Sequence, residues 1–490
     1  MSRQTVDVPS SSAPCLTVPE DSAEKAIASP LVARLGLVLV SLIPLFLMRG
    51  MLGPVRDPDA FWHIRAGEYL WKSHSFTGPE PWSRFSTRPW TLHEWLPELG
   101  MFATYRLGGL PAVAWLSASA SVLMFVLLYL LCREFSDVIP AGIAAVVAWV
   151  GMSASLGPRP QMLSFFFVCV TTLVWLRTVK DGRPRLWLVL MAWLWACCHG
   201  MWFLGPLLGF TAILGMLLDG RFPRRRVSRL AVIPTLGVVM AAVTPVGPAL
   251  LRAPFSVGNY TQYVSEWAAP NLRDPYVLAT HVLALLVAVT WSRSRSSVSW
   301  AHIGLWVVAV GWSLLYSRTV VIAACMLAPL AAEAIQRFLP STQPHRRARA
   351  REAAVLTGSA LLSFVVAAFF APAVAARPAD VPDGLDTQLS ALPSGTVVYN
   401  TYGLGGWLLL SHPQLDPVID GRTEVFSVAY VDRYVRSLQA LPGWLSTVRA
   451  SGAQVALLER DTALLDVLER QHWRDMGHDN GYVLLRAPSS

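Results

Sequence analysis

The sequence predicts an α-helical polytopic membrane protein that carries a small C-terminal α/β domain. Three observations support this class. Hydrophobic residues make up 54% of the 490 residues and charged residues only 14%, too little charge to cover a soluble protein of this size. Apolar runs of about 16–23 residues recur along the chain, which is typical of membrane-spanning helices. Residues 378–490 instead show short alternating apolar runs and an excess of acidic residues, which favours a separate soluble domain.

The apolar runs predict about eleven transmembrane helices in a domain that covers residues 33–377. A helix needs about 20 residues to cross the hydrocarbon layer, and the fifth run is short and abuts the sixth at His199–Gly200. That junction predicts a tight hairpin or a partly re-entrant element. The expected spans are approximately 33–50, 110–132, 138–156, 161–178, 185–199, 201–218, 230–251, 276–291, 299–316, 319–337 and 353–375.

The charge of the connecting loops predicts the orientation. The loops after the fourth, sixth, eighth and tenth spans are rich in arginine, and they include Arg346, Arg347 and Arg349 in the last of them. Basic loops stay in the cytoplasm, so residues 1–32 are expected to form a disordered cytoplasmic tail. The first loop, 51–109, and the 378–490 domain are then extracytoplasmic. The net charge of +9 follows from these loops and does not indicate a nucleic-acid partner.

The first outer loop concentrates titratable and aromatic residues directly after a span. In a helix, Asp59, His63 and Glu68 would lie on roughly one face, with Trp62 and Tyr69 towards the membrane interface. A carboxylate beside a histidine in a half-dry setting can act as a general base, and the same pair could hold a divalent cation. A hydrated loop start is the alternative. The loop also brings Asp57, His93 and Glu94.

Two arginines stand at outer membrane edges, where topology disfavours positive charge. Arg159 lies between two prolines in the Gly157–Gln161 turn, and Arg318 follows the ninth span. Guanidinium groups bind phosphate through paired hydrogen bonds, so these arginines suggest an anionic ligand. Snorkelling at the interface is the alternative for Arg159.

Further candidate residues lie in the remaining outer segments. Glu266 belongs to a SerGluTrpAlaAlaPro segment, and Asp420 and Arg422 belong to IleAspGlyArgThrGlu, where a turn and an Arg422–Glu424 pair are the simpler interpretation. Glycines 403, 405 and 406 only weakly suggest a phosphate-binding loop, because such loops need a strand before and a helix after. The cysteines show no metal-binding spacing and are expected to be buried thiols.

Taken together, these motifs resemble a family of bacterial multi-spanning proteins that is similar to the GT-C glycosyltransferases. The resemblance covers about residues 30–480, and Cys198 departs from it by replacing an Asn-like polar residue. The motifs are Asp-x-Asp-x-x-TrpHisIle-x-x-Gly at 57–67, PheSer at 85–86, GluTrpLeu at 94–96, ArgProGln at 159–161, HisGly at 199–200, GluTrp at 266–267 and AspGlyArg at 420–422.

The resemblance implies an enzyme of the bacterial plasma membrane that uses a sugar carried on polyprenyl phosphate. An acid of the first outer loop typically acts as the base in such enzymes, and this role falls on Asp57 or Asp59, with His63 beside them. Membrane lipids and a glycan, lipid or protein acceptor are the implied partners. A transport or non-catalytic factor in envelope glycan assembly is the alternative. The expected substrate-binding residues are His93, Glu94, Arg159, Gln161, His199, Glu266, Arg318, Asp420 and Arg422.

Overall fold

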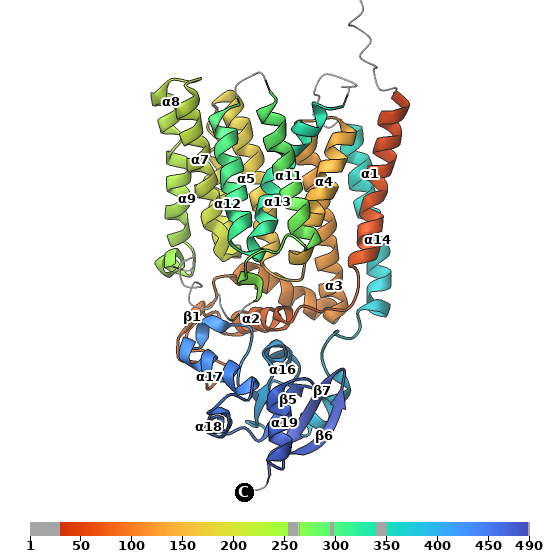
Figure 1. The fold of residues 1–490 in the computed structure, drawn as a ribbon, viewed down its shortest axis with the longest axis vertical. Helices are drawn as coiled ribbons and strands as arrows, with labels where there is room; N and C mark the ends of the chain where they lie inside the picture. Colours follow the sequence, from red (N-terminus) through yellow and green to blue (C-terminus); the bar gives the residue numbers. More distant parts are fainter. Residues whose placement is uncertain (1–29, 253–262, 264, 295–297, 340–349, 489–490) are drawn as a thin grey trace, which may run out of the picture.

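The computed structural model describes residues 30–252, 263, 265–294, 298–339 and 350–488. Figure 1 shows a bundle of long helices with a smaller unit of helices and strands attached at one end. The expected tail lies outside the described residues up to position 29, as do Arg346, Arg347 and Arg349 of the last basic loop.

Each of the eleven expected spans overlaps a helix of the bundle, although the expected span 230–251 is α-helical only over Val232–Ala242. The helices are α1 (Pro30–Met51), α3 (Trp95–Arg133), α4 (Val138–Met152), α5 (Gln161–Asp181), α6 (Trp187–Cys198), α7 (Leu204–Asp219), α9 (Val232–Ala242), α11 (Pro275–Ser292), α12 (Trp300–Leu315), α13 (Val320–Gln336) and α14 (Ala350–Val374). Within the described residues, eight helical segments are long and apolar enough to cross a membrane, whereas α6 and α12 are shorter apolar helices and α9 has 11 residues. The chain is therefore a multi-pass membrane protein.

The helix α3 contains both a peripheral segment and a span. Its backbone leaves helical geometry at Gly108 and Gly109, and Gly109 has a φ of 64°, a conformation that glycine adopts without steric cost. Pro111 follows at once and has no N–H to continue the hydrogen-bond ladder. The kink explains why the apolar run begins at about residue 110 although the helix begins at Trp95.

The first outer loop folds into α2 (Asp59–Ser73), a small hairpin of β1 (Thr77–Gly78) and β2 (Trp90–Thr91), and the first part of α3. The helix α2 lies at the end of the bundle next to the C-terminal unit (Figure 1). It packs closely on α3 because Gly67 has no side chain: a Cβ there would overlap the carbonyl oxygen of Glu98. This close approach brings side chains of α2 against the first turns of α3.

The C-terminal unit is built around a five-stranded sheet of order β4-β3-β5-β7-β6. The strand β3 pairs in parallel with β4 and β5, whereas β7 pairs antiparallel with β5 and β6. This arrangement confirms the predicted small C-terminal α/β unit. Its elements are α15 (Asp386–Ser390), β3 (Val397–Asn400), α16 (Gly405–Ser411), β4 (Asp416–Pro417), α17 (Val428–Leu438), α18 (Trp444–Ser451), β5 (Val455–Glu459), α19 (Ala463–Arg470), β6 (Arg474–Asp479) and β7 (Tyr482–Arg486).

Gly405 and Gly406, the first two residues of α16, permit close packing inside the C-terminal unit and against the start of α2. A Cβ at Gly405 would overlap the Ile419 carbonyl oxygen, and a Cβ at Gly406 would lie 2.7 Å from the Pro58 carbonyl oxygen. Strand and helix do flank these glycines as a phosphate loop requires, but protein atoms fill the space that a phosphate would need. Gly405 therefore serves close packing within the C-terminal unit, and Gly406 serves close packing between that unit and the start of α2.

Candidate functional site

Arg159 gathers three carboxylates from distant parts of the chain. It lies in the turn before α5, where its N–H donates to the Gly157 carbonyl oxygen at 2.8 Å. Its guanidinium donates through Nε to Asp57 Oδ2, lies 3.2 Å from Asp59 Oδ2, and contacts Glu266 Oε1 at 2.6 Å. Arg318 joins the group through Glu266 Oε2 at 3.3 Å. We call Asp57, Asp59, Arg159, Glu266 and Arg318 the edge cluster.

The two aspartates of the edge cluster have different environments. Asp57 Oδ1 accepts the N–H of Asp59 at 3.0 Å, and Asp57 Oδ2 accepts Arg159, so both oxygens hold local structure. Asp59 Oδ1 accepts Trp62 Nε1 at 3.0 Å. Burial, opposed by the Arg159 charge, raises the pKa of Asp59 to about 6. A carboxylate of this pKa suits general-base chemistry near neutral pH better than an ordinary aspartate does.

Arg159 and Arg318 differ in how their guanidinium N–H donors are paired with protein groups. Burial disfavours the Arg159 cation, but the surrounding carboxylates outweigh this effect and hold its pKa above the ordinary value. Arg159 is therefore occupied by protein ligands. Arg318 lies over the Trp267 ring at 5.7 Å, and its buried Nε has no hydrogen-bond partner among the residues that the structure describes. This Nε–H of Arg318 is a buried donor that a phosphate oxygen could accept.

A second group of titratable side chains lies where α2, the start of α3 and the α6–α7 junction meet. His63 Nδ1 lies 3.0 Å from Glu98 Oε1 and 3.8 Å from Glu94 Oε2. Glu94 Oε1 also lies 3.2 Å from His199 Nε2 and 3.5 Å from His93 Nε2. All but His93 are buried. We call these five residues the histidine–glutamate cluster.

The residues of the histidine–glutamate cluster differ in their protonation states. Burial lowers the pKa of His63 to about 3, although Glu94 opposes the shift, so this imidazole is neutral. Burial also disfavours charge on His93, but its hydrogen bond with Glu94 outweighs this and raises its pKa to about 10. Glu94 is thus an ionised carboxylate beside a cationic His93.

The structure corrects the expected use of α2. Glu68 does not join Asp59 and His63, because it pairs with Arg65 and Lys72 on the same helix. Trp62 does not face the membrane interface: it is 8% exposed, packs in the core shared with the C-terminal unit and donates to Asp59. Asp59 and His63 therefore belong to different clusters, and the expected cation site on Asp59, His63 and Glu68 does not form.

Asp420 and Arg422 form a buried ionic group on either side of Gly421, which packs against Asp59 of the edge cluster. Arg422 binds both oxygens of Asp420, at 2.9 and 2.7 Å, and binds Glu80 Oε1 at 2.6 Å. Its guanidinium lies 4.4 Å from the centre of the Trp82 ring and 5.0 Å from that of Trp90. All three ionic side chains are fully buried. The partners of Arg422 are thus Asp420 and Glu80, not Glu424, and the group holds the first outer loop to the C-terminal unit.

The remaining expected residue, Gln161, is the first residue of α5 and is buried beside the Arg159 turn. Its Nε2 donates to the Ser155 carbonyl oxygen at 3.4 Å, and its Oε1 has no hydrogen-bond partner within the described part of the chain. Sequence reasoning missed Glu98, Glu80 and Gly421. Glu98 stands four residues after Glu94, so helical spacing alone would have placed both carboxylates on one face. The importance of Gly421 has no local signal: a Cβ there would overlap Asp59 Oδ1, a contact made only after folding.

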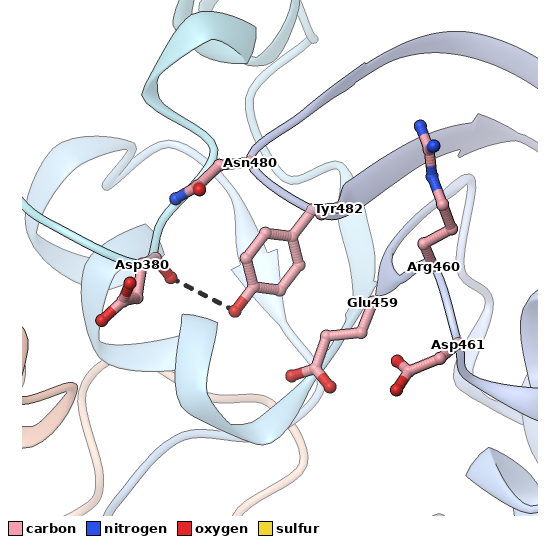
Figure 2. Close-up of a pocket in the computed structure, with 7 residues that line it drawn as sticks. Asp380, Glu459, Arg460, Asp461, Asn480 and Tyr482 are labelled. Carbon is pink, nitrogen blue, oxygen red and sulfur yellow. Dashed lines mark hydrogen bonds between the residues drawn. The ribbon is translucent and has the colours of Figure 1, made fainter.

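A cavity of about 420 Å³ lies in the C-terminal unit, near the end of β5 and the turn between β6 and β7. Figure 2 shows Asp380, Glu459 and Asp461 around it, with Tyr482 donating to the Asp380 carbonyl oxygen at 3.2 Å. No expected site residue lines this cavity. Its three carboxylates outnumber Arg460, so it does not suit a phosphate ligand.

The five cysteines among the described residues are free and buried, as expected.

No protein-family model matches the sequence, and no curated protein matches it. Solved structures do match. The archaeal oligosaccharyltransferase AglB from Archaeoglobus fulgidus, in complex with an inhibitory peptide and a dolichol-phosphate, matches with a TM-score of 0.58 and 12% identity over 88% of this chain and 69% of that chain.

The chain has a GT-C glycosyltransferase fold. A second structure of the Archaeoglobus fulgidus oligosaccharyltransferase, tethered to an acceptor peptide, agrees at a TM-score of 0.59 and 12% identity, over 88% of this chain and 70% of that one. ArnT from Cupriavidus metallidurans, bound to undecaprenyl phosphate, has a TM-score of 0.49 and 16% identity over 94% of this chain and 99% of that chain. The predicted GT-C-like fold is confirmed, and the edge cluster lies at the end of its helical bundle.

Proposed function

We propose that this protein is a membrane glycosyltransferase that takes its sugar from a polyprenyl-phosphate donor at the outer face of a bacterial plasma membrane. The edge cluster carries the proposal, because it places a carboxylate of raised pKa beside two arginines at the end of a GT-C-type helical bundle. The dolichol-phosphate of the archaeal oligosaccharyltransferase complex supports a lipid phosphate as the donor group.

In this proposal Asp59 is the base and Asp57 is a positioning residue. The acceptor hydroxyl gives its proton to Asp59, and its oxygen attacks the anomeric carbon of the sugar. The bond from that carbon to the phosphate oxygen breaks, so the configuration inverts and the polyprenyl phosphate leaves as an anion. Arg318, with its unpartnered Nε, stabilises the negative charge that develops on the phosphate. Glu266 and Arg159 hold this arginine and the base in place.

The test is sugar transfer by the purified protein in proteoliposomes, with a series of polyprenyl-phosphate sugars as donors. Because the pKa of Asp59 is about 6, we expect kcat/KM to be level above this pH. Below it, protonation removes the base, so the rate should fall about tenfold per pH unit. Nucleotide sugars serve as the control donors and should be inactive. Transfer from nucleotide sugars alone would overturn the proposal, and absence of any transfer would favour the alternative of an assembly or transport factor.

The proposed orientation places the C-terminal unit outside the cell. The basic helix α8 (Arg224–Arg229) and the C-terminal unit lie at opposite ends of the bundle (Figure 1), and basic segments remain cytoplasmic. Reporter fusions after residues 225 and 440 should therefore report opposite compartments, with the 440 fusion extracytoplasmic. The same compartment for both fusions, or the reverse assignment, would contradict this orientation.

A further inference from the structure

We infer that His63, Glu94 and Glu98 bind one divalent cation, with Zn²⁺ preferred. One ligand atom from each side chain lies within 4.8 Å of the others. The His63 Nδ1 distances of 3.0 Å to Glu98 and 3.8 Å to Glu94 bracket the separation of about 3.4 Å expected for two ligands at about 2.1 Å from a tetrahedral zinc.

An independent observation points to a missing ligand for Glu98. This side chain is only 2% exposed, and its Oε2 is buried without a hydrogen-bond partner among the described residues. Buried carboxylates are normally paired or coordinate metals. The imidazole ligand favours zinc or another transition metal over Mg²⁺, which prefers oxygen.

His199 supplies the outer support that metal ligands usually have. Its Nδ1 accepts the N–H of Met201 at 3.2 Å, so in the neutral ring the proton resides on Nε2. That nitrogen lies 3.2 Å from Glu94 Oε1, while Glu94 Oε2 lies 3.8 Å from His63 Nδ1. A donor that orients a ligating carboxylate in this way is a common second layer of metal sites.

The proposed cation is separate from the aspartates of the edge cluster. The carboxyl oxygens of Asp57 and Asp59 contact the Asp59 N–H, Arg159 or Trp62. The three proposed ligands instead contact one another, His93 or His199. The ion would instead link α2 to the start of α3 one helical turn after Asp59. It would fix the helix that carries Asp59 and Trp62. The inference does not depend on glycosyl transfer, because binding is measured without turnover.

The test begins with the full-length protein purified in detergent without chelator, and its metal content measured by plasma mass spectrometry. We expect about one equivalent of zinc, or its recovery when Zn²⁺ alone is added after chelation. X-ray absorption should show only nitrogen and oxygen ligands near 2.0–2.1 Å. Absence of saturable binding, or a sulfur shell at about 2.3 Å from cysteine, would overturn the inference.

Variants locate the site. Glu98→Gln keeps the side-chain shape and should weaken zinc binding by more than the 10–100-fold typical of a lost supporting residue, whereas His199→Asn should fall within that range. His412→Gln is the matched control, because His412 is equally buried but pairs with Asp386 in the C-terminal unit. Wild-type affinity in Glu98→Gln would overturn the assignment. If that variant does not accumulate, His63→Gln is measured against the same control.

Discussion

Asp59→Asn should reduce sugar transfer by about 10²–10⁴-fold, the usual effect of removing a general base. Asparagine has the same shape and can still accept the Trp62 N–H that Asp59 accepts at 3.0 Å, but it cannot take a proton from the acceptor. The loss should appear in kcat, because the donor is held by other groups. The measurement is initial-rate transfer at matched protein amounts, with thermal unfolding to show that the variant is folded.

Asp57→Asn separates catalysis from positioning. Asp57 holds Arg159 and the Asp59 N–H, so its replacement should lower activity less than Asp59→Asn does. The acid limb should remain but move below pH 6, because the Asp57 charge helps to raise the pKa of Asp59. Asp59→Asn should lose that limb from whatever rate remains. Asp383→Asn is the control for a carboxylate remote from the edge cluster, paired with exposed Arg377, and should be neutral. Near wild-type transfer by Asp59→Asn would remove Asp59 as the base.

Arg422→Met should destabilise the folded protein by about 3–5 kcal/mol, because it leaves buried charges without their partner. Arg422 is fully buried between Trp82 and Trp90 and serves both Asp420 and Glu80. Methionine fills part of the space but leaves two carboxylates in the interior. The measurement is thermal unfolding in detergent, together with protease sensitivity of the contact between the first outer loop and the C-terminal unit.

Arg84→Met is the matched control for this effect. Arg84 also links the first outer loop to the C-terminal unit, through Asp416, but half of its side chain is exposed. Exposed pairs contribute about 0–1 kcal/mol, so this variant should unfold almost as the wild type does. Adding Glu80→Gln to Arg422→Met should recover part of the loss, because one unpaired charge is removed. Equal effects of Arg84→Met and Arg422→Met would show that burial does not set the energy of the Arg422 group.

Local sequence patterns predicted some residues of the candidate site and not others. Asp57, Asp59 and Arg159 were recognisable because acids and prolines near span ends are unusual, and the structure brings them together across 102 residues of sequence. The pairing of Arg422 with Glu80 spans 342 residues, and nothing near either residue predicts it. Helical periodicity also predicted Trp62 at the membrane interface, but in the structure this side chain packs against the C-terminal unit.

The sequence by itself determined the membrane-spanning helices and the small C-terminal α/β unit. Hydropathy and the alternation of short apolar runs are local properties of the sequence. Each indicates whether a segment is surrounded by lipid or by water. Only the tertiary structure decided which charges meet. Docking of the C-terminal unit places Gly421 against Asp59, encloses Arg422, and leaves His63 with Glu94 and Glu98 instead of Asp59. Burial and long-range pairing set the protonation and the partners of these groups, and neither is encoded in the spacing of residues along one helix.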